Sequence, residues 1–545
     1  MMPNRTHGRI RIATAAGVIA GTIVTSVWVR AQLSTDNRPL ASLIPPGALL
    51  YLEAKDLHGL LDEWNNSAEK KLWLTSTNHD VLSRSRLLQR LEQAHDEFTD
   101  VAGIPIQMNL LDQMAGGRSA FAFYNLSALA FVYVTEMPAD RIESTELWRT
   151  RARYQPRDVS GISFYVKSDE AGERTVAFAS YKRFFVVATS EDLMAKTLVL
   201  LAGQNGASIA NDTWFKDATS QSAGAGDLRL VYNLTALLAT PQFRTYWIQR
   251  NRSELKPFRA GISDLFQAAD SFEERRVLLR QSEAQPVTTD SSITEALSYA
   301  SQSSSLYRAW SMPDRAVLAG ALQQVIFGED TAPAVYNPPA PTVSTEAGGV
   351  GSEADLEIRI DEPPFERASE RTVGPLADAL MSMQPVALVH VQTTAMLDDQ
   401  VFVMPASGIV AVCKQPDRNR IERALAQTAG ISQRASLDPL QVSLSGHAVM
   451  VSRLQLTPGQ HAPLPQDVTY VAVYNHGAEW PHYKKLFAIV DRTPGSPEAP
   501  ETPAFFSANV RSLGDSLSRL ERASILSADG GTAVHETVRY ELAHQ

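Results

Sequence analysis

A short motif that ends a strand and begins a helix occurs three times in this sequence. A strand-like run, then Pro-Asp-Arg or Pro-Ala-Asp-Arg, then a helix-like run occurs as AFVYVTEMPADRIEST, SLYRAWSMPDRAVLAGAL and GIVAVCKQPDRNRIERAL. Proline ends the strand because it has no N–H to donate to the ladder. Asp140, Asp314 and Asp417 then stand where a carboxylate can cap the helix that follows. The motif therefore predicts three strand-to-helix connections.

A related unit consists of a strand, an Asn or Asp, and a turn rich in apolar residues. It occurs as LLYLEAKDLHGLLDEW, LRLVYNLTALLATPQF and TYVAVYNHGAEWPHYKKLF. Because both units occur on each side of residues 329–355, they indicate two similar sheet-and-helix portions. Chance similarity between short amphipathic segments is the alternative interpretation. With 545 residues, 44% of them hydrophobic, the chain is long enough for two or three domains with separate cores.

Alternation of apolar and polar residues, together with β-branched and aromatic side chains, predicts short strands. We expect strands at Ala48–Ala54, Ser119–Tyr124, Leu129–Thr135, Thr175–Ala179, Phe184–Thr189, Leu228–Tyr232, Val386–Val391, Gly408–Cys413, Gln441–Ser445, Ala448–Arg453, Tyr470–Tyr474 and Val534–Leu542. We expect helices at Asp80–Val101, Glu191–Leu201, Phe258–Gln267, Ala316–Ile326, Arg420–Thr428 and Ser512–Leu520. Strands joined by tight turns, as around Tyr181–Arg183, favour antiparallel pairing. The predicted fold class is α+β, with antiparallel sheets, covering helices and two similar portions after an N-terminal membrane helix.

The N-terminal residues combine a basic segment with an uncharged apolar stretch at 13–29. Arginines flank this stretch, three before it and one after it: Arg5, Arg9, Arg11 and Arg30. Its length, about 17 residues, is at the lower limit for a spanning helix and slightly long for the core of a cleaved signal peptide. We expect an uncleaved anchor; a signal peptide cleaved after Ala31 and a buried helix are the alternatives. The arginine excess predicts a single-pass inner-membrane protein with its bulk on the periplasmic or extracellular side.

The composition of the chain changes sharply at 329–355, which are rich in Pro, Gly, Ala, Thr and Ser. Such a stretch cannot bury enough apolar area to order itself, so we interpret it as a linker. The expected division is a cytoplasmic segment at 1–12, a membrane anchor or signal segment at 13–30, a tether at 31–46, a first α+β portion at 47–328, the linker at 329–355 and a second α+β portion at 356–545.

Several segments along the chain resemble those of a known group of proteins. They are PPGALLYLEAKDLHGLLDEW, GGRSAFAFYN, YKRFFVVATS and DLRLVYNLTALL, and, near the C-terminus, PAFFSANVRSLGDSLSRL and HETVRYEL. In this order, after an N-terminal anchor, they resemble a family of uncharacterised bacterial membrane-anchored envelope proteins catalogued only as a domain of unknown function. The resemblance extends from about Leu43 to Leu542 and implies an architecture and a location. The resemblance assigns no catalytic or ligand-binding residue.

Charge and motifs exclude several classes of function. The formal net charge of -10 argues against a general nucleic-acid binder, which needs a basic face. Cys413 is the single cysteine, so a disulfide framework and a paired-cysteine zinc site are excluded. The sequence contains no GxxxxGK[ST], HExxH or GxSxG. We therefore assign no catalytic, cofactor-binding or metal-ligating residue.

The histidines offer few candidates for chemistry. His476, Glu479, Trp480 and His482 form one short group of potential ligands. Residues six apart do not share one face of a helix, so a structural or solvent-exposed role is the favoured interpretation. His390 falls in an expected strand, which indicates a paired core or sheet-face side chain.

Cations and aromatic residues alternate in one segment of the first portion. The candidate surface-contact residues are Arg244, Tyr246, Trp247, Arg250, Arg252 and Lys256. This pattern is typical of a surface helix whose arginine stems lie along apolar surface. Contact with a membrane or an envelope polymer is the alternative. The expected outward location disfavours nucleic acid.

The anchor, the repeated core pattern and the missing catalytic motifs favour a non-enzymatic envelope protein. The leading hypothesis is a binding or scaffolding surface for another envelope protein. The second is a carrier of lipid or another apolar ligand, since curved antiparallel sheets covered by helices can enclose an apolar pocket. The third is a hydrolase with a dispersed active site.

Overall fold

A computed structural model describes most of the chain from Arg38 to Ala543. The described residues are 38–76, 79, 95–105, 108–125, 128–172, 174–240, 255–284, 292–301, 304–327, 368–396, 403–427, 440–459, 464, 467–490, 514–515 and 517–543.

The described strands form a single 18-stranded sheet in which every pairing is antiparallel. The strands are β1 (Leu50–Ala54), β2 (Ser119–Asn125), β3 (Ala130–Glu136), β4 (Gln155–Val159), β5 (Ile162–Ser168), β6 (Thr175–Tyr181), β7 (Phe184–Ala188), β8 (Leu228–Tyr232), β9 (Phe258–Gln267), β10 (Ser271–Arg280), β11 (Leu306–Ser311), β12 (Pro385–Met396), β13 (Val403–Cys413), β14 (Gln441–Ser445), β15 (Ala448–Ser452), β16 (Val468–Tyr474), β17 (Leu520–Asp529) and β18 (Ala533–Leu542).

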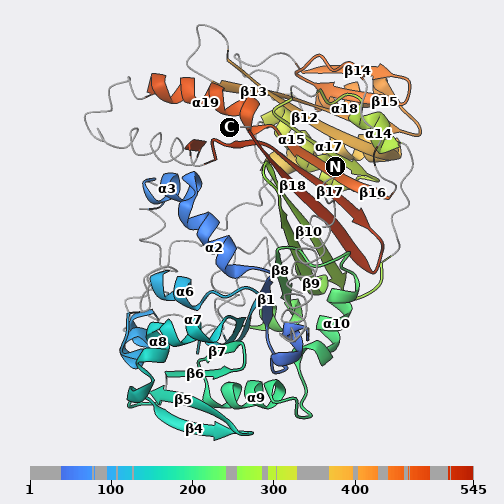
Figure 1. Ribbon diagram of the computed structural model, residues 1–545. Coiled ribbons are helices and arrows are strands. Elements are labelled where there is room, and N and C mark those ends of the chain that lie inside the picture. Colours follow the sequence, from blue (N-terminus) through green and yellow to red (C-terminus); the bar gives the residue numbers. More distant parts are fainter. Residues whose placement is uncertain are drawn as a thin grey trace, which may run out of the picture.

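Cross-strand pairing places the strands in the order β4-β5-β6-β7-β3-β2-β1-β8-β9-β10-β18-β17-β16-β11-β12-β13-β15-β14. The ladder between β10 and β18 runs from Ser271 opposite Glu541 to Leu279 opposite Ala533. It joins a lower half, built from β1–β10, to an upper half, built from β11–β18 (Figure 1). The structure therefore confirms an α+β fold built on antiparallel sheet.

Helices lie on both faces of the sheet in each half. They are α2 (Leu57–Asn66), α3 (Ala68–Leu74), α6 (Met108–Met114), α7 (Ala139–Ser144), α8 (Glu146–Arg149), α9 (Glu191–Leu201), α10 (Thr213–Ser220), α11 (Leu234–Ala239), α14 (Ser292–Leu297), α15 (Arg315–Phe327), α17 (Ala368–Ser382), α18 (Arg418–Gln427) and α19 (His476–Val490), with short 3-10 helices at Leu40–Leu43, Arg151–Arg153 and Ile209–Asn211.

Alternate residues of one strand belong to different cores, because successive side chains point to opposite faces. In β3, Val132 and Val134 pack with α9 and α10, whereas Tyr133 packs with α6, α7 and α8. In β12, Leu388 packs with α15, α17 and α18, whereas Val389 packs with α14. Each half is thus a helix–sheet–helix sandwich with two cores.

The repeated motif forms the predicted strand-to-helix connections, with one difference in capping. Asp314 Oδ1 accepts a hydrogen bond from the N–H of Val317 at 2.8 Å, and Asp417 Oδ1 accepts one from Arg420 at 3.1 Å. The predicted cap at Asp140 is wrong, because the N-cap of α7 is Pro138. The inserted Ala139 moves Asp140 into the first helical turn, where its carboxylate still faces the positive end of the helix dipole.

Two of the predicted helices need correction. Residues 258–267 form the strand β9 instead of a helix, since pairing with β8 and β10 outweighs the helical spacing of their apolar side chains. Within 512–520, Gly514 and Asp515 are helical, but residues 517–519 form a turn and Leu520 begins β17. Residues 95–101 of the long helix predicted at Asp80–Val101 are helical, and 80–94 lie outside the described residues.

The upper half draws residues from both sides of the expected linker. β11 and α15 precede 329–355 in sequence, yet β11 pairs with β12 and β16, and α15 packs against α17. The expected segments at 1–12, 13–30 and 329–355 lie outside the described residues. Within the described part of the chain, no helix combines the length and the apolar character needed to cross a bilayer.

Candidate ligand-binding cleft

A cleft of about 1130 Å³ opens between helices α2 and α3 and the strands that join the two halves. We call α2 and α3 together the arm. The arm leaves the lower half after β1 and passes over the sheet towards the upper half (Figure 1). The cleft therefore depends on both halves of the molecule.

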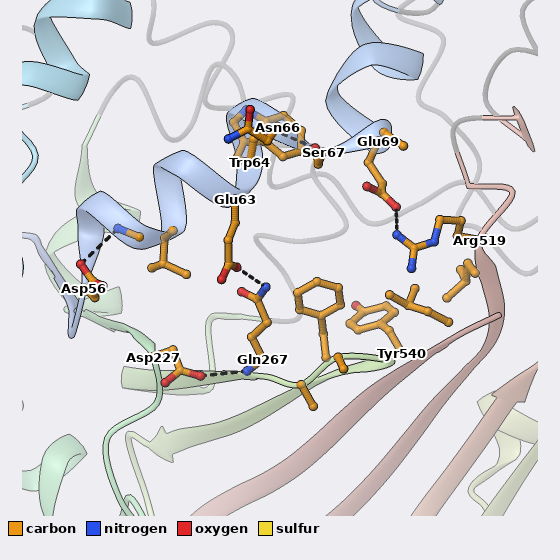
Figure 2. Close-up of a pocket in the computed structure, with 18 of the residues that line it drawn as sticks. Asp56, Glu63, Trp64, Asn66, Ser67, Glu69, Asp227, Gln267, Arg519 and Tyr540 are labelled. Carbon is orange, nitrogen blue, oxygen red and sulfur yellow. Dashed lines mark hydrogen bonds and ion pairs between the residues drawn. The ribbon is translucent and has the colours of Figure 1, made fainter. Parts of the chain in front are cut away.

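The floor of the cleft is formed by cross-strand neighbours of β9, β10, β17 and β18. Phe272 of β10 lies directly opposite Tyr540 of β18, and Gln267 of β9 lies opposite Phe272 on its other side. Leu520 and Leu542 form a further opposed pair at the same end of the ladder. Side chains opposed in this way share one face of the sheet, so the floor is an apolar and aromatic strip (Figure 2).

The roof of the cleft is the amphipathic helix α2, with the start of α3. Asp56 begins α2 by accepting a hydrogen bond from the N–H of Gly59 at 3.1 Å, and Ser67 begins α3 by accepting one from Lys70 at 3.1 Å. Leu60 and Trp64 line the cleft from α2. Neither helix contains a buried residue, and only Leu57, at the start of α2, packs against one of the four cores.

Polar bridges hold the arm over the floor (Figure 2). The side-chain amide of Gln267 donates to Glu63 Oε2 at 2.7 Å, and Arg519 pairs with Glu69 at 2.5 Å.

Near the start of the arm, Lys55 pairs with Asp227 at 3.6 Å, and Asp227 also accepts from the backbone N–H of Gln267 at 2.9 Å. Because the charged groups that line the cleft already have protein partners, the surface left for a ligand is mainly apolar.

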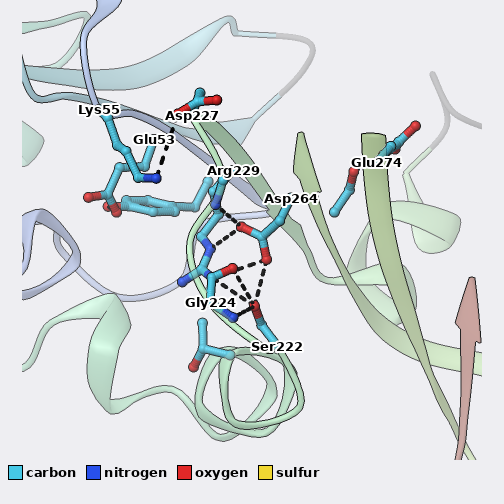
Figure 3. Close-up of polar contacts among 12 residues, drawn as sticks. Glu53, Lys55, Ser222, Gly224, Asp227, Arg229, Asp264 and Glu274 are labelled. Carbon is cyan, nitrogen blue, oxygen red and sulfur yellow. Dashed lines mark hydrogen bonds and ion pairs between the residues drawn. The ribbon is translucent and has the colours of Figure 1, made fainter. Parts of the chain in front are cut away.

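A buried ion pair fixes the segment that carries Asp227. Asp264 accepts from Arg229 Nε at 2.7 Å and Nη2 at 3.0 Å, from Ser222 Oγ at 2.6 Å and from the N–H of Gly226 at 2.9 Å (Figure 3). A Cβ at position 226 would lie 2.4 Å from the carbonyl oxygen of Leu265. The close approach requires glycine here, and four donors satisfy the buried carboxylate.

The cation-rich segment of the lower half contributes nothing to this cleft in the described residues. Arg244, Tyr246, Trp247, Arg250 and Arg252 lie outside them. Lys256 is exposed in the turn before β9 and does not line the cleft.

The histidine group predicted to be structural or exposed is gathered at the start of α19. His476, Glu479 and Trp480 are buried, and the His476 and Trp480 rings stack with centroids 5.8 Å apart. Thr394 donates to Glu479 at 3.0 Å, and burial lowers the pKa of His476. A satisfied carboxylate and a neutral imidazole in the core are typical of a structural role.

The residues that line the cleft include few groups capable of acid–base or nucleophilic chemistry. No histidine or cysteine is among the residues that line it, and the Ser67 hydroxyl caps α3 and donates to the carbonyl of Trp64. Within the described ranges, no group of three histidine, cysteine or acidic side chains is arranged to hold a metal ion. The buried thiol of Cys413 has a pKa raised to about 12 by burial and lies in the upper core, away from the cleft.

The sequence did not single out the residues of the cleft. Glu63, which no sequence motif marks, anchors the arm to Gln267. One available signal was the spacing of Leu57, Leu60, Leu61 and Trp64, which gives α2 an apolar face.

Comparison with known proteins adds no family assignment. No protein-family model and no curated protein matches the sequence. Among solved structures, crystal form I of TP0453 is 12% identical, with 48% of this chain and 85% of that chain covered and a TM-score of 0.26. Crystal form III of TP0453 is 14% identical, with 45% and 81% covered and a TM-score of 0.24. No inference about fold or function rests on similarities this low.

Proposed function

We propose that this protein is a non-enzymatic binding module of the bacterial cell envelope, and that the cleft holds the apolar body of an elongated, lipid-like ligand. The observation that carries the proposal is the mainly apolar cleft of about 1130 Å³ between the arm and the β10–β18 junction. Typical small-molecule sites measure about 300–1,000 Å³. The cleft thus has room for an acyl chain together with part of a headgroup.

Burial of methylene groups supplies the driving force for such a ligand. Each buried methylene contributes about 0.8 kcal/mol, so ten of them contribute about 8 kcal/mol before the cost of association. The aromatic rings of Phe272 and Tyr540 on the floor and Trp64 on the roof add large apolar areas. A scaffold for another envelope protein, the alternative binding role, does not need a slot of this kind. The absence of a nucleophile–base pair among the lining residues favours binding over hydrolysis.

We further propose that the segment at 13–30 anchors the protein in the inner membrane, with the bulk on the periplasmic or extracellular side. Support comes from the arginines before that stretch and from the resemblance to membrane-anchored envelope proteins. In that location the cleft has access to lipid and to envelope proteins, the expected partners.

We also propose that the two halves are copies of one design. Strands β1, β2, β3, β6, β7, β8, β9 and β10 pair among themselves in the same pattern as β11, β12, β13, β14, β15, β16, β17 and β18. Only β4 and β5 have no counterpart in this scheme. The joining ladder pairs β10 with its own counterpart, β18, in antiparallel fashion. Such a pairing is expected of two copies related by an approximate twofold axis.

Filling the cleft tests the ligand proposal. Ala269 is exposed on the β9–β10 turn and lines the cleft, so Ala269→Trp should block it without disturbing a core. Ala207 is also exposed but lies in the lower half away from the cleft, which makes Ala207→Trp the matched control. Native mass spectrometry of the full chain, purified from membranes, should detect a co-purified lipid-like ligand in the wild type and the control. Its occupancy should fall at least tenfold in Ala269→Trp. Equal occupancy in the two variants, or no ligand in the wild type, would overturn the proposal.

A further inference from the structure

The last turn of the arm presents apolar side chains to solvent. Leu72 is 39% exposed and Leu74 is 49% exposed, and Lys71 beside them is exposed as well. α3 buries none of its residues. Single exposed leucines are common on soluble proteins, but clusters of them mark interaction sites.

The helix that carries these leucines also lines the cleft. Ala68 and Glu69 of α3 line the cleft, and so do Trp64, which is 44% exposed, and Leu517. Figure 1 shows α3 at the far end of the arm, away from the sheet. α3 therefore contributes both to the wall of the cleft and to the exposed tip that carries Leu72 and Leu74.

The helix that follows the matching strand of the upper half is packed quite differently. α15 follows β11 as α2 follows β1, and its Leu318 and Leu322 are fully buried against Val373 and Leu376 of α17. Within the arm, by contrast, only Leu57 packs against a core, Leu60 and Trp64 line the cleft, and Leu72 and Leu74 are exposed.

We propose that the tip of α3 is a membrane-contact site, at which Leu72 and Leu74 enter the acyl layer of a bilayer and Lys71 meets anionic headgroups. This inference rests on the proposed function, because it supplies the route by which a lipid reaches the cleft. A bilayer is the occupant that the observations favour. Exposed leucines beside lysine match the apolar and anionic layers of a membrane surface, and the same helix lines the cleft proposed to hold a lipid-like ligand.

Site-specific labelling of the full chain tests the contact. Leu72→Cys and Leu74→Cys each accept an environment-sensitive fluorophore, while the buried native Cys413 stays unlabelled in the folded protein. Leu444→Cys is the matched control, because Leu444 is 41% exposed but lies on β14 at the far edge of the sheet. The labelled protein is reconstituted in phosphatidylcholine–phosphatidylglycerol vesicles that contain a nitroxide lipid. In a second experiment, the protein is reconstituted in vesicles without nitroxide lipid, and vesicles that contain it are added afterwards.

We expect at least twofold stronger quenching at positions 72 and 74 than at position 444 in one of these two experiments. Lys71→Glu should reduce this quenching in the anionic vesicles and leave it unchanged in pure phosphatidylcholine. Equal quenching at the three positions, or a blue-shifted but unquenched label, would overturn the proposal; the second result indicates a protein partner.

The Ala269→Trp variant separates this proposal from the proposed function. It should lose its co-purified ligand and keep the quenching at positions 72 and 74. Loss of quenching in that variant would contradict an independent membrane contact.

Discussion

His390 makes the stability of the upper half sensitive to mild acid. Its ring is fully buried in β12, opposite Arg308 of β11, and neither ring nitrogen has a hydrogen-bond partner in the described structure. Burial, reinforced by the positive charge of Arg308, lowers the pKa of His390 to about 3. In an unfolded chain the pKa of histidine is about 6.5. The folded protein therefore holds a neutral imidazole where the unfolded chain takes up a proton.

The sign and size of the effect follow from this difference. Between pH 6.5 and pH 3 the unfolded state binds more protons than the folded state, so stability is intact above pH 6.5 and falls as the pH falls. Between pH 7 and pH 5 the loss is about 2 kcal/mol. His390→Leu removes both the titration and two unsatisfied nitrogens, so its own cost at pH 7 should be small.

Hydrogen exchange of the β11 and β12 amides in the full chain, followed by mass spectrometry at pH 7 and pH 5, measures the opening free energy locally. After correction for the intrinsic pH dependence of exchange, the wild type should lose about 2 kcal/mol more than His390→Leu. Equal losses in the two proteins would refute the reasoning and place the acid sensitivity elsewhere.

Two further predictions concern the lower half and the repeated motif. Asp264→Ala leaves Arg229 and the N–H of Gly226 without their acceptor, so it should lower the free energy of unfolding of the full chain, measured by thermal unfolding, by about 3–5 kcal/mol. Asp264→Asn keeps one oxygen and should lower it by less. Equal losses in the two variants would show that the negative charge of Asp264 does not contribute. Asp314→Ala and Asp417→Ala each remove a helix cap and should cost about 1 kcal/mol, whereas Asp140→Ala should cost under half of that, because Asp140 caps nothing. A cost at Asp140 as large as at Asp314 would contradict the different connection at α7.

Local patterns were sufficient to predict most of the elements on which the fold depends. The hairpin of β6 and β7 was predicted because apolar residues alternate on both sides of the short turn at Tyr181–Arg183, and Tyr181 indeed pairs with Phe184. α9, α15 and α18 were predicted because each combines a polar N-terminal residue with helical spacing. These signals lie within a few residues of the element that they specify.

The central ladder could not be predicted in the same way. β10 reads SFEERRVLLR, and its charges suggested no buried strand. Its exposed Arg275 lies on one face, while Phe272 on the other face forms the cleft floor. The residues opposite β10 are supplied by β18, at the other end of the chain, and no short-range pattern encodes that partner. The cleft was missed for the same reason, since Phe272 and Tyr540 meet only through this pairing.

Photo-crosslinking with a lipid that carries a diazirine on its acyl chain tests the central claim most directly, because it reports where the apolar body of the ligand lies. The full chain, reconstituted with this lipid and irradiated, is digested and its crosslinked peptides are identified. Crosslinks are predicted in the peptides that contain Phe272 and Tyr540 on the floor and Leu60 or Trp64 on the roof, and they should disappear in Ala269→Trp but persist in Ala207→Trp. Crosslinks found only outside the β10–β18 junction, or crosslinks that are unchanged in Ala269→Trp, would contradict a ligand in this cleft.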